Sequence, residues 1–194
     1  MTKIGIIGAG EVGGQIARAA LLNGYEVVLA NSRAPDTLVS LVAWPEPGNR
    51  LPVEELAGKT VLDTNNYMAW RDGRIAVIDS GEKTEHEVRQ EQLPRSRVAK
   101  AFTHIQAPVL LTAGRPPGDP GRLALSVSSD SPDAVALVTR LYDQFGFDTV
   151  DNSPLSESWR TAPGQPAWNH HDRQTRPDLA RNLRQARFVP HTRP

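Results

Sequence analysis

The chain has 194 residues, the length of one compact domain or of one domain with a tail. Its 22 basic and 22 acidic residues cancel, so no net charge attracts nucleic acid or an anionic membrane. The absence of cysteine excludes disulfides and thiolate metal sites, and no run approaches the roughly 20 apolar residues of a membrane-spanning helix. With no charged leader before an apolar run, we expect a cytoplasmic protein.

The N-terminal segment predicts a β-α-β unit. Ile4 to Ile7 is a short apolar run that ends at glycine, which is typical of a buried parallel strand. A helix is expected from Val12 to Asn23, with Gly24 as its C-terminal cap, and Val27 to Ala30 predicts the second strand. Crossovers of this kind are right-handed in nearly all proteins.

The rest of the chain predicts further strands and helices separated by loops rich in proline and glycine. The expected strands are Thr60–Thr64, Ile75–Asp79, Arg97–Phe102, Leu123–Ser128 and residues 148–151. The expected helical segments are Thr37–Val42, Val53–Leu56, Thr84–Leu93, Gln106–Thr112 and a long helix between Ser131 and Gly146.

The C-terminal segment has a different composition. Residues 159–194 hold seven arginines, two aspartates and few apolar side chains. Such a segment cannot bury enough apolar surface to fold by itself, so it predicts disorder. We expect a nucleotide-binding domain of residues 1–158 followed by a basic, disordered tail of residues 159–194.

The sequence GAGEVG after the first strand has the glycine spacing of a dinucleotide-binding turn. Gly8 allows the tight turn, Gly10 lets a pyrophosphate approach the backbone, and Gly13 lets the helix pack closely on the strand. The helix N-terminus adds unpaired N–H groups. The alternative is a glycine-rich turn that binds nothing. We expect the phosphates to lie against Gly8, Ala9, Gly10, Glu11, Val12 and Gly13.

Asn31, Ser32 and Arg33 follow the second strand, where NAD-binding proteins carry a carboxylate for the ribose 2′-hydroxyl. A carboxylate would repel a 2′-phosphate, whereas Ser32 can donate a hydrogen bond and Arg33 can form a bidentate pair with it. These three residues therefore predict NADP as the cofactor. The alternative is that Arg33 is a solvated turn residue.

The chain resembles the NADPH-dependent reductases of coenzyme F420, also called F420-dependent NADP oxidoreductases, in four segments: KIGIIGAGEVGGQIARAALLNGYEVVLANSR, VLDTNNY, RVAKAF and PLSESWR. The resemblance runs from about Met1 to Arg160. It implies a homodimer that passes a hydride directly between nicotinamide C4 and C5 of F420, its small-molecule co-substrate, with no side-chain nucleophile required. It also implies that the deazaflavin is lined by Thr103, His104, Ile105, Gln106 and Ala107.

Compared with that family, about thirty residues, including a helix and a strand, are missing between Leu38 and Val53. In a doubly wound sheet this strand would lie beside the first one. We therefore expect an α/β fold: a Rossmann-like, doubly wound, mostly parallel sheet with helices on both faces, but shortened. Either TVLDT pairs with KIGII instead, or the domain is unstable alone.

Several features leave the function open. Family members carry Asn-Thr or His-Thr where this chain has Thr103-His104, so His104 could polarise the deazaflavin or pack beneath it. The alternative functions are an NADPH-dependent reductase of another small acceptor, such as an imine, and a non-catalytic NADP-binding module.

Asp63 is expected to cap a turn. His170-His171 with Asp172 lacks a further suitably spaced ligand, so we predict no metal site.

Overall fold

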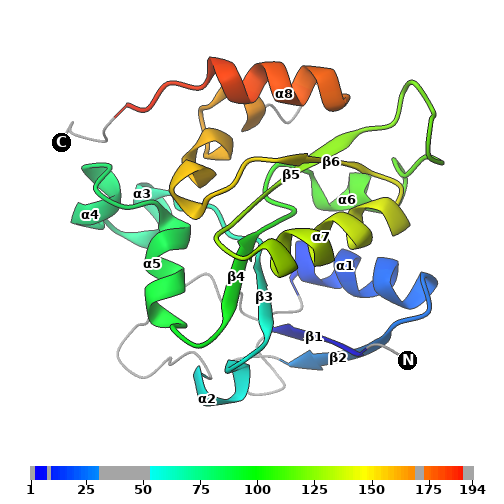
Figure 1. Ribbon diagram of the computed structural model, residues 1–194, viewed down its shortest axis with the longest axis horizontal. Coiled ribbons are helices and arrows are strands. Elements are labelled where there is room, and N and C mark those ends of the chain that lie inside the picture. The colour runs from blue at the N-terminus through cyan, green and yellow to red at the C-terminus, as the bar shows by residue number, and fades with distance from the viewer. Residues whose placement is uncertain (1–2, 8–9, 31–52, 169–172, 190–194) are drawn as a thin grey trace.

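The computed structural model describes residues 3–7, 10–30, 53–168 and 173–189 (Figure 1). The strands are β1 (Lys3–Ile7), β2 (Glu26–Ala30), β3 (Thr60–Asp63), β4 (Arg97–Lys100), β5 (Ala124–Ser129) and β6 (Asp148–Asp151). The helices are α1 (Glu11–Leu22), α2 (Val53–Leu56), α3 (Ala69–Asp72), α4 (Ala76–Asp79), α5 (Glu85–Gln92), α6 (Ala107–Leu110), α7 (Pro132–Gln144) and α8 (Arg176–Gln185). Two 3₁₀ segments are η1 (Leu155–Thr161) and η2 (Pro166–Trp168). The expected helix Thr37–Val42 lies outside the described residues.

Within the described residues the strands form two sheets. β1 and β2 pair in parallel, while the second sheet has the order β3-β4-β5-β6. β4 and β5 are antiparallel, and the other two pairs are parallel. The expected pairing of TVLDT with KIGII is wrong for the described strands: β1 pairs with β2 alone, and β3 pairs with β4 alone. Among the described strands, β1 and β3 therefore belong to separate sheets.

Helices cover both faces of the second sheet, as Figure 1 shows, so the fold is the Rossmann-like α/β arrangement predicted. On one face, α7 packs against β5 and α1 packs against α6, with Val127 and Ala20 in the main core. On the other face lie α5, η1 and α8, which pack over Val98 and Ala124. Neighbouring strand residues enter different cores because side chains alternate across a sheet.

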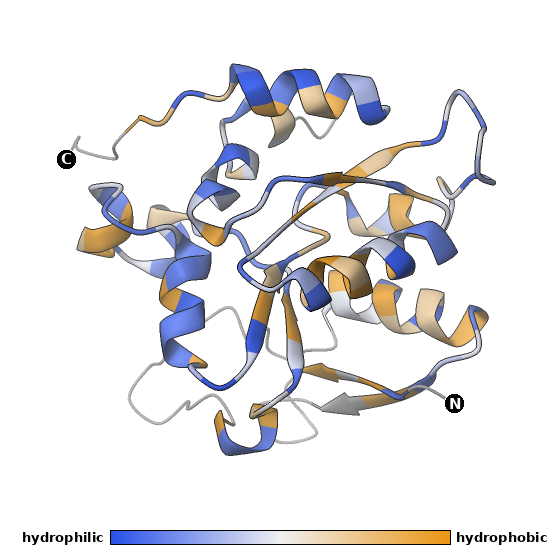
Figure 2. Ribbon diagram, viewed as in Figure 1, coloured by the Kyte–Doolittle hydropathy of each residue, from blue (hydrophilic) through white to orange (hydrophobic). Residues whose placement is uncertain are grey.

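The β1–β2 unit is less covered than the second sheet. Parallel strands are normally buried on both faces, yet only Ile6 of β1 is buried. Figure 2 shows apolar residues on β1 and at the C-terminal end of α1, where Leu21 and Leu22 are 59% and 81% exposed. This part of the fold joins the main core through α1, whose Ala19 and Ala20 are buried there.

Helix α7 forms as its sequence predicts. Ser131 caps the N-terminus, accepting a hydrogen bond from the Ala134 N–H, and Pro132 occupies the first turn. Tyr142 is buried and its hydroxyl donates to the Ser126 carbonyl at 2.9 Å. The same hydroxyl accepts from the Phe102 N–H at 2.9 Å, so α7 fixes the chain where it leaves β4.

Two expectations for secondary structure are wrong. Ile75–Asp79 was expected as a strand but contains the short helix α4, because an apolar run this brief has no periodicity that separates strand from helix. The expected disorder after Trp159 is also wrong for the described residues. Leu179 and Leu183, four residues apart on α8, are buried against Ala124 of β5. The domain boundary at residue 158 stays a prediction.

Candidate functional site

The first part of the site is the N-terminus of α1. Ile7 and Ala30 are register partners, so the carboxyl ends of β1 and β2 lie at one edge, where open α/β sheets bind ligands. Gly10 is the N-cap of α1 and no described side chain caps this helix. A Cβ built on Gly10 would meet no heavy atom of the described residues within 4 Å. Unpaired N–H groups at a helix N-terminus fit a pyrophosphate.

The structure covers only part of the predicted nucleotide site. Gly10 and the first turn of α1, with Glu11, Val12 and Gly13, are described. Gly8 and Ala9 lie outside the described residues, as do Asn31, Ser32 and Arg33. The phosphate and 2′-phosphate assignments therefore stay predictions.

The second part of the site lies where the chain leaves β3 and β4. The Asn66 side-chain nitrogen donates to the Thr103 carbonyl at 2.8 Å and ties the two loops together. The Asn66 Oδ1 and the Thr103 hydroxyl are both buried, and neither has a hydrogen-bond partner within the part of the chain that the structure describes. Buried polar atoms without partners are rare, and those at the carboxyl ends of parallel strands are candidates for ligand contacts.

The loop after β3 is held by carboxylates on both sides of Asn66. Asp63 accepts from the Asn65 N–H at 3.1 Å, which is the turn cap expected from the sequence. Glu85 of α5 accepts from the Tyr67 N–H at 2.7 Å. Since the backbone is fixed before and after it, the Asn66 side chain has little freedom to move.

The predicted deazaflavin segment forms the turn between β4 and α6. Thr103, His104 and Ala107 are buried, Ile105 is half-buried, and Gln106 is the exposed N-cap of α6. His104 Nε2 accepts a 2.9 Å hydrogen bond from the Ser126 N–H of β5. Of the two roles considered for His104, this contact favours packing under the site, because it engages one ring nitrogen with the backbone of β5. The contact of these five residues with deazaflavin stays a prediction.

A cluster of buried charges that the sequence analysis missed underlies these loops. Asp63 and Arg89 form an ion pair of 3.0 Å with side chains only 5% and 9% exposed. The Lys100 ammonium donates to the Ser158 carbonyl of η1 at 2.9 Å. Burial lowers the pKa of Lys100 to about 8, against the attraction of Glu85. Burial also raises the pKa of Glu85 to about 7, with the Asp63 carboxylate adding to the effect.

His86 lies in the same cluster. It is 1% exposed, and no group in the described segments forms a hydrogen bond with its Nε2. Burial lowers the pKa of His86 to about 3, and the Lys100 charge adds to this shift. The ring is therefore neutral at pH 7 and acts as a packed side chain rather than as a cation.

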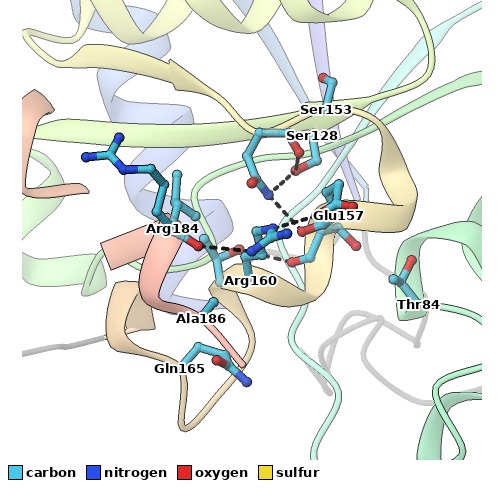
Figure 3. Close-up of polar contacts among 12 residues, drawn as sticks. Thr84, Ser128, Ser153, Glu157, Arg160, Gln165, Arg184 and Ala186 are labelled. Atoms are coloured by element: carbon cyan, nitrogen blue, oxygen red, sulfur yellow. Dashed lines mark hydrogen bonds and ion pairs between the residues drawn. The ribbon is translucent and has the colours of Figure 1, made fainter. Parts of the chain in front are cut away.

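The segment PLSESWR anchors η1 to this cluster. Leu155 and Ser158 are fully buried, and the Leu155 carbonyl accepts from the Thr84 hydroxyl at 3.0 Å. Figure 3 shows Arg160 reaching across to α8, where it donates to the Leu183 carbonyl at 3.2 Å. The motif therefore ties α5, β4 and α8 together rather than presenting a reactive side chain.

Neither a membrane span nor a metal centre is found in the described parts of the chain. None of the described helices has the length and apolar character that crossing a bilayer needs. No three His, Asp or Glu side chains there gather as metal ligands, and His170, His171 and Asp172 lie outside those parts.

Comparison with known proteins gives one family match. Residues 3–57 match the family described as NADP oxidoreductase, coenzyme F420-dependent. YjhV of Escherichia coli K12 is 40% identical over 67 residues, which is 34% of this chain and 49% of that protein. The match thus spans about half the length of this relative.

Two solved structures share the fold over most of the chain. A candidate F420-dependent NADP reductase from Arthrobacter sp. FB24 has a TM-score of 0.64 at 21% identity, with 81% of this chain and 87% of that one covered. The hypothetical protein SMa0349 of Sinorhizobium meliloti also has a TM-score of 0.64, at 24% identity, covering 86% and 92%. At these identities the likeness concerns the fold. The match to the family of coenzyme F420-dependent NADP oxidoreductases itself covers residues 3–57, less than half of the chain.

Proposed function

We propose that the protein transfers a hydride between NADPH and the deazaflavin coenzyme F420. The observation that carries this proposal is the N-terminus of α1, which no described side chain caps, within the segment that matches the family, since an NADP pyrophosphate needs such a helix end. NADP and F420 supply the redox chemistry, a hydride passing between nicotinamide C4 and deazaflavin C5.

The protein's part is to hold the two rings in contact and exclude water. Gly10 and the first turn of α1 would hold the phosphates, and Ser32 with Arg33 would select the 2′-phosphate. The segment from Thr103 to Ala107 would line the deazaflavin from the turn after β4. The proposal includes a homodimer and a cytoplasmic location, both of which come from the family resemblance and the sequence.

A second candidate is a non-catalytic NADP-binding module. The separation of β1 and β3 into two sheets among the described strands favours it, because a strand between them would form a wall of the nicotinamide pocket. Transfer to another small acceptor, such as an imine, is the remaining alternative, since related nucleotide-binding folds serve different substrates.

Turnover separates these candidates. The full chain is mixed with NADPH and oxidised F420, and the deazaflavin absorbance is followed. Its loss supports the reductase. Tight NADPH binding without loss of absorbance would leave the module or another acceptor, and a panel of cyclic imines then distinguishes those two.

Selection for NADP is tested with Arg33→Ala. If Arg33 binds the 2′-phosphate, the variant should lose affinity for NADPH by at least about tenfold and keep its affinity for NADH. An equal loss of affinity for NADPH and NADH would show that Arg33 has no part in selecting the 2′-phosphate.

A further inference from the structure

Two buried oxygens at the ends of β3 and β4 have no hydrogen-bond partner among the described residues. They are the Asn66 Oδ1 and the Thr103 Oγ1, and Thr103 is only 5% exposed. Both belong to the same contact, because Asn66 Nδ2 donates to the Thr103 carbonyl at 2.8 Å. This bond fixes the amide orientation: if the amide were turned over, two oxygens would face each other.

The unpaired oxygens lie on backbone that other contacts hold in place. Beyond the bonds to Asn65 and Tyr67, the Asn66 carbonyl accepts from Arg71 at 2.7 Å. On the other loop, Phe102 adopts φ 59°, a strained left-handed conformation, immediately before Thr103. A held backbone that leaves polar atoms unpaired is the arrangement expected of a preformed binding site.

The chemistry of the two oxygens defines what they can bind. Asn66 Oδ1 can only accept a hydrogen bond, so it requires an N–H group. The Thr103 hydroxyl can donate, and its natural partner beside an N–H is a carbonyl oxygen. An N–H next to a C=O is the edge of an amide or imide, which phosphates and riboses lack.

We infer that Asn66 and Thr103 together bind an amide edge of the nicotinamide or deazaflavin ligand. This inference rests on the proposed function and adds Asn66, which neither the sequence motifs nor the family match assigns, as a binding residue. Two groups have such an edge: the carboxamide of nicotinamide and the pyrimidine imide of the deazaflavin. Either contact would fix the rotation of a reacting ring in its plane.

The test uses Thr103→Val and Asn66→Ala in the full chain. Valine has nearly the shape of threonine and removes only the unpaired hydroxyl, so Thr103→Val should leave the thermal midpoint unchanged or raised. It should still lower the affinity for the ligand by about tenfold, as loss of one hydrogen bond does. If Thr103 had a merely structural role, Thr103→Val would lower the thermal midpoint without changing the affinity for the ligand.

Two matched controls separate binding from folding. Asn65→Ala changes the neighbouring asparagine but keeps the backbone N–H that bonds to Asp63. Thr161→Val makes the same substitution at a buried threonine whose hydroxyl donates to the Ser158 carbonyl at 3.3 Å. Thr161→Val should lower the thermal midpoint, and both controls should keep wild-type affinities.

The ligands titrated are NADP⁺, its 3-acetylpyridine analogue, which replaces the amide nitrogen with a methyl group, and oxidised F420. If the edge is the carboxamide, wild type prefers NADP⁺ over the analogue and Asn66→Ala removes that preference. If the edge is the imide of the deazaflavin, both variants lower the affinity for F420 and leave the affinities for the two nucleotides unchanged. Unchanged affinities for all three ligands would overturn the inference and leave the proposed function standing. Failure of wild type to bind NADP⁺ or F420 would instead contradict the proposed function itself.

Discussion

Replacing His86 with leucine should change how the free energy of unfolding depends on pH. The ring is buried and burial lowers its pKa to about 3, whereas an unfolded histidine titrates near 6.5. Between these values the unfolded state binds the extra proton, so this residue makes the protein less stable as the pH falls from about 6.5. At pH 4.5, about two units below 6.5, the loss is about 3 kcal/mol, at 1.36 kcal/mol per unit.

Glu85 acts in the opposite direction, because burial raises its pKa to about 7 and the folded state then binds the extra proton as the pH falls. The measurement therefore compares wild type with His86→Leu by urea denaturation at pH 7.5, 6.5, 5.5 and 4.5. Both proteins contain Glu85, so its contribution to the pH dependence cancels in the difference. We expect wild type to lose about 3 kcal/mol relative to the variant across this range. The control Leu93→Ala should be less stable by about 2–5 kcal/mol at every pH. Parallel curves for wild type and His86→Leu would refute the reasoning.

Three further changes test other parts of the structure. Gly10→Val should keep the thermal midpoint, because a Cβ there would meet no heavy atom of the described residues within 4 Å, yet lower NADPH affinity at least about tenfold by titration; unchanged affinity would contradict the phosphate assignment. Arg89→Met leaves the Asp63 carboxylate buried without its ion-pair partner and should cost about 3–5 kcal/mol in urea denaturation, whereas a cost below about 1 kcal/mol would mean that the pair is dispensable. Leu179→Ala should cost about 2–5 kcal/mol and speed proteolysis within α8; wild-type resistance would show that α8 does not need this contact.

The parts of the fold that sequence predicts best are those whose local signals agree. Helix α7 combines a serine cap, a proline in the first turn and one apolar stripe, and it forms as expected. Helix α8 was missed because composition was averaged over residues 159–194. The average hides Leu179 and Leu183, which share one helix face, and Thr175, whose capping box with Asp178 starts the helix.

The pairing of β3 and the buried contacts of the site depend on contacts distant in sequence. Nothing local to TVLDT indicates which strand it pairs with. Lys100 lies within the apolar run RVAKAF, and its burial against η1 depends on a carbonyl 58 residues away. Asn66 follows a strand, where asparagine ordinarily indicates a turn, so its unpaired oxygen could be found only from the structure.

The most direct test of the proposed function is a titration of the full chain with NADPH and with NADH, followed in the same cuvette by oxidised F420. We predict that NADPH binds more tightly than NADH and that the deazaflavin absorbance is lost once F420 is added. Equal affinity for the two nucleotides, or an absorbance that stays constant with NADPH bound, would contradict the assignment of this protein as an NADPH-dependent F420 reductase.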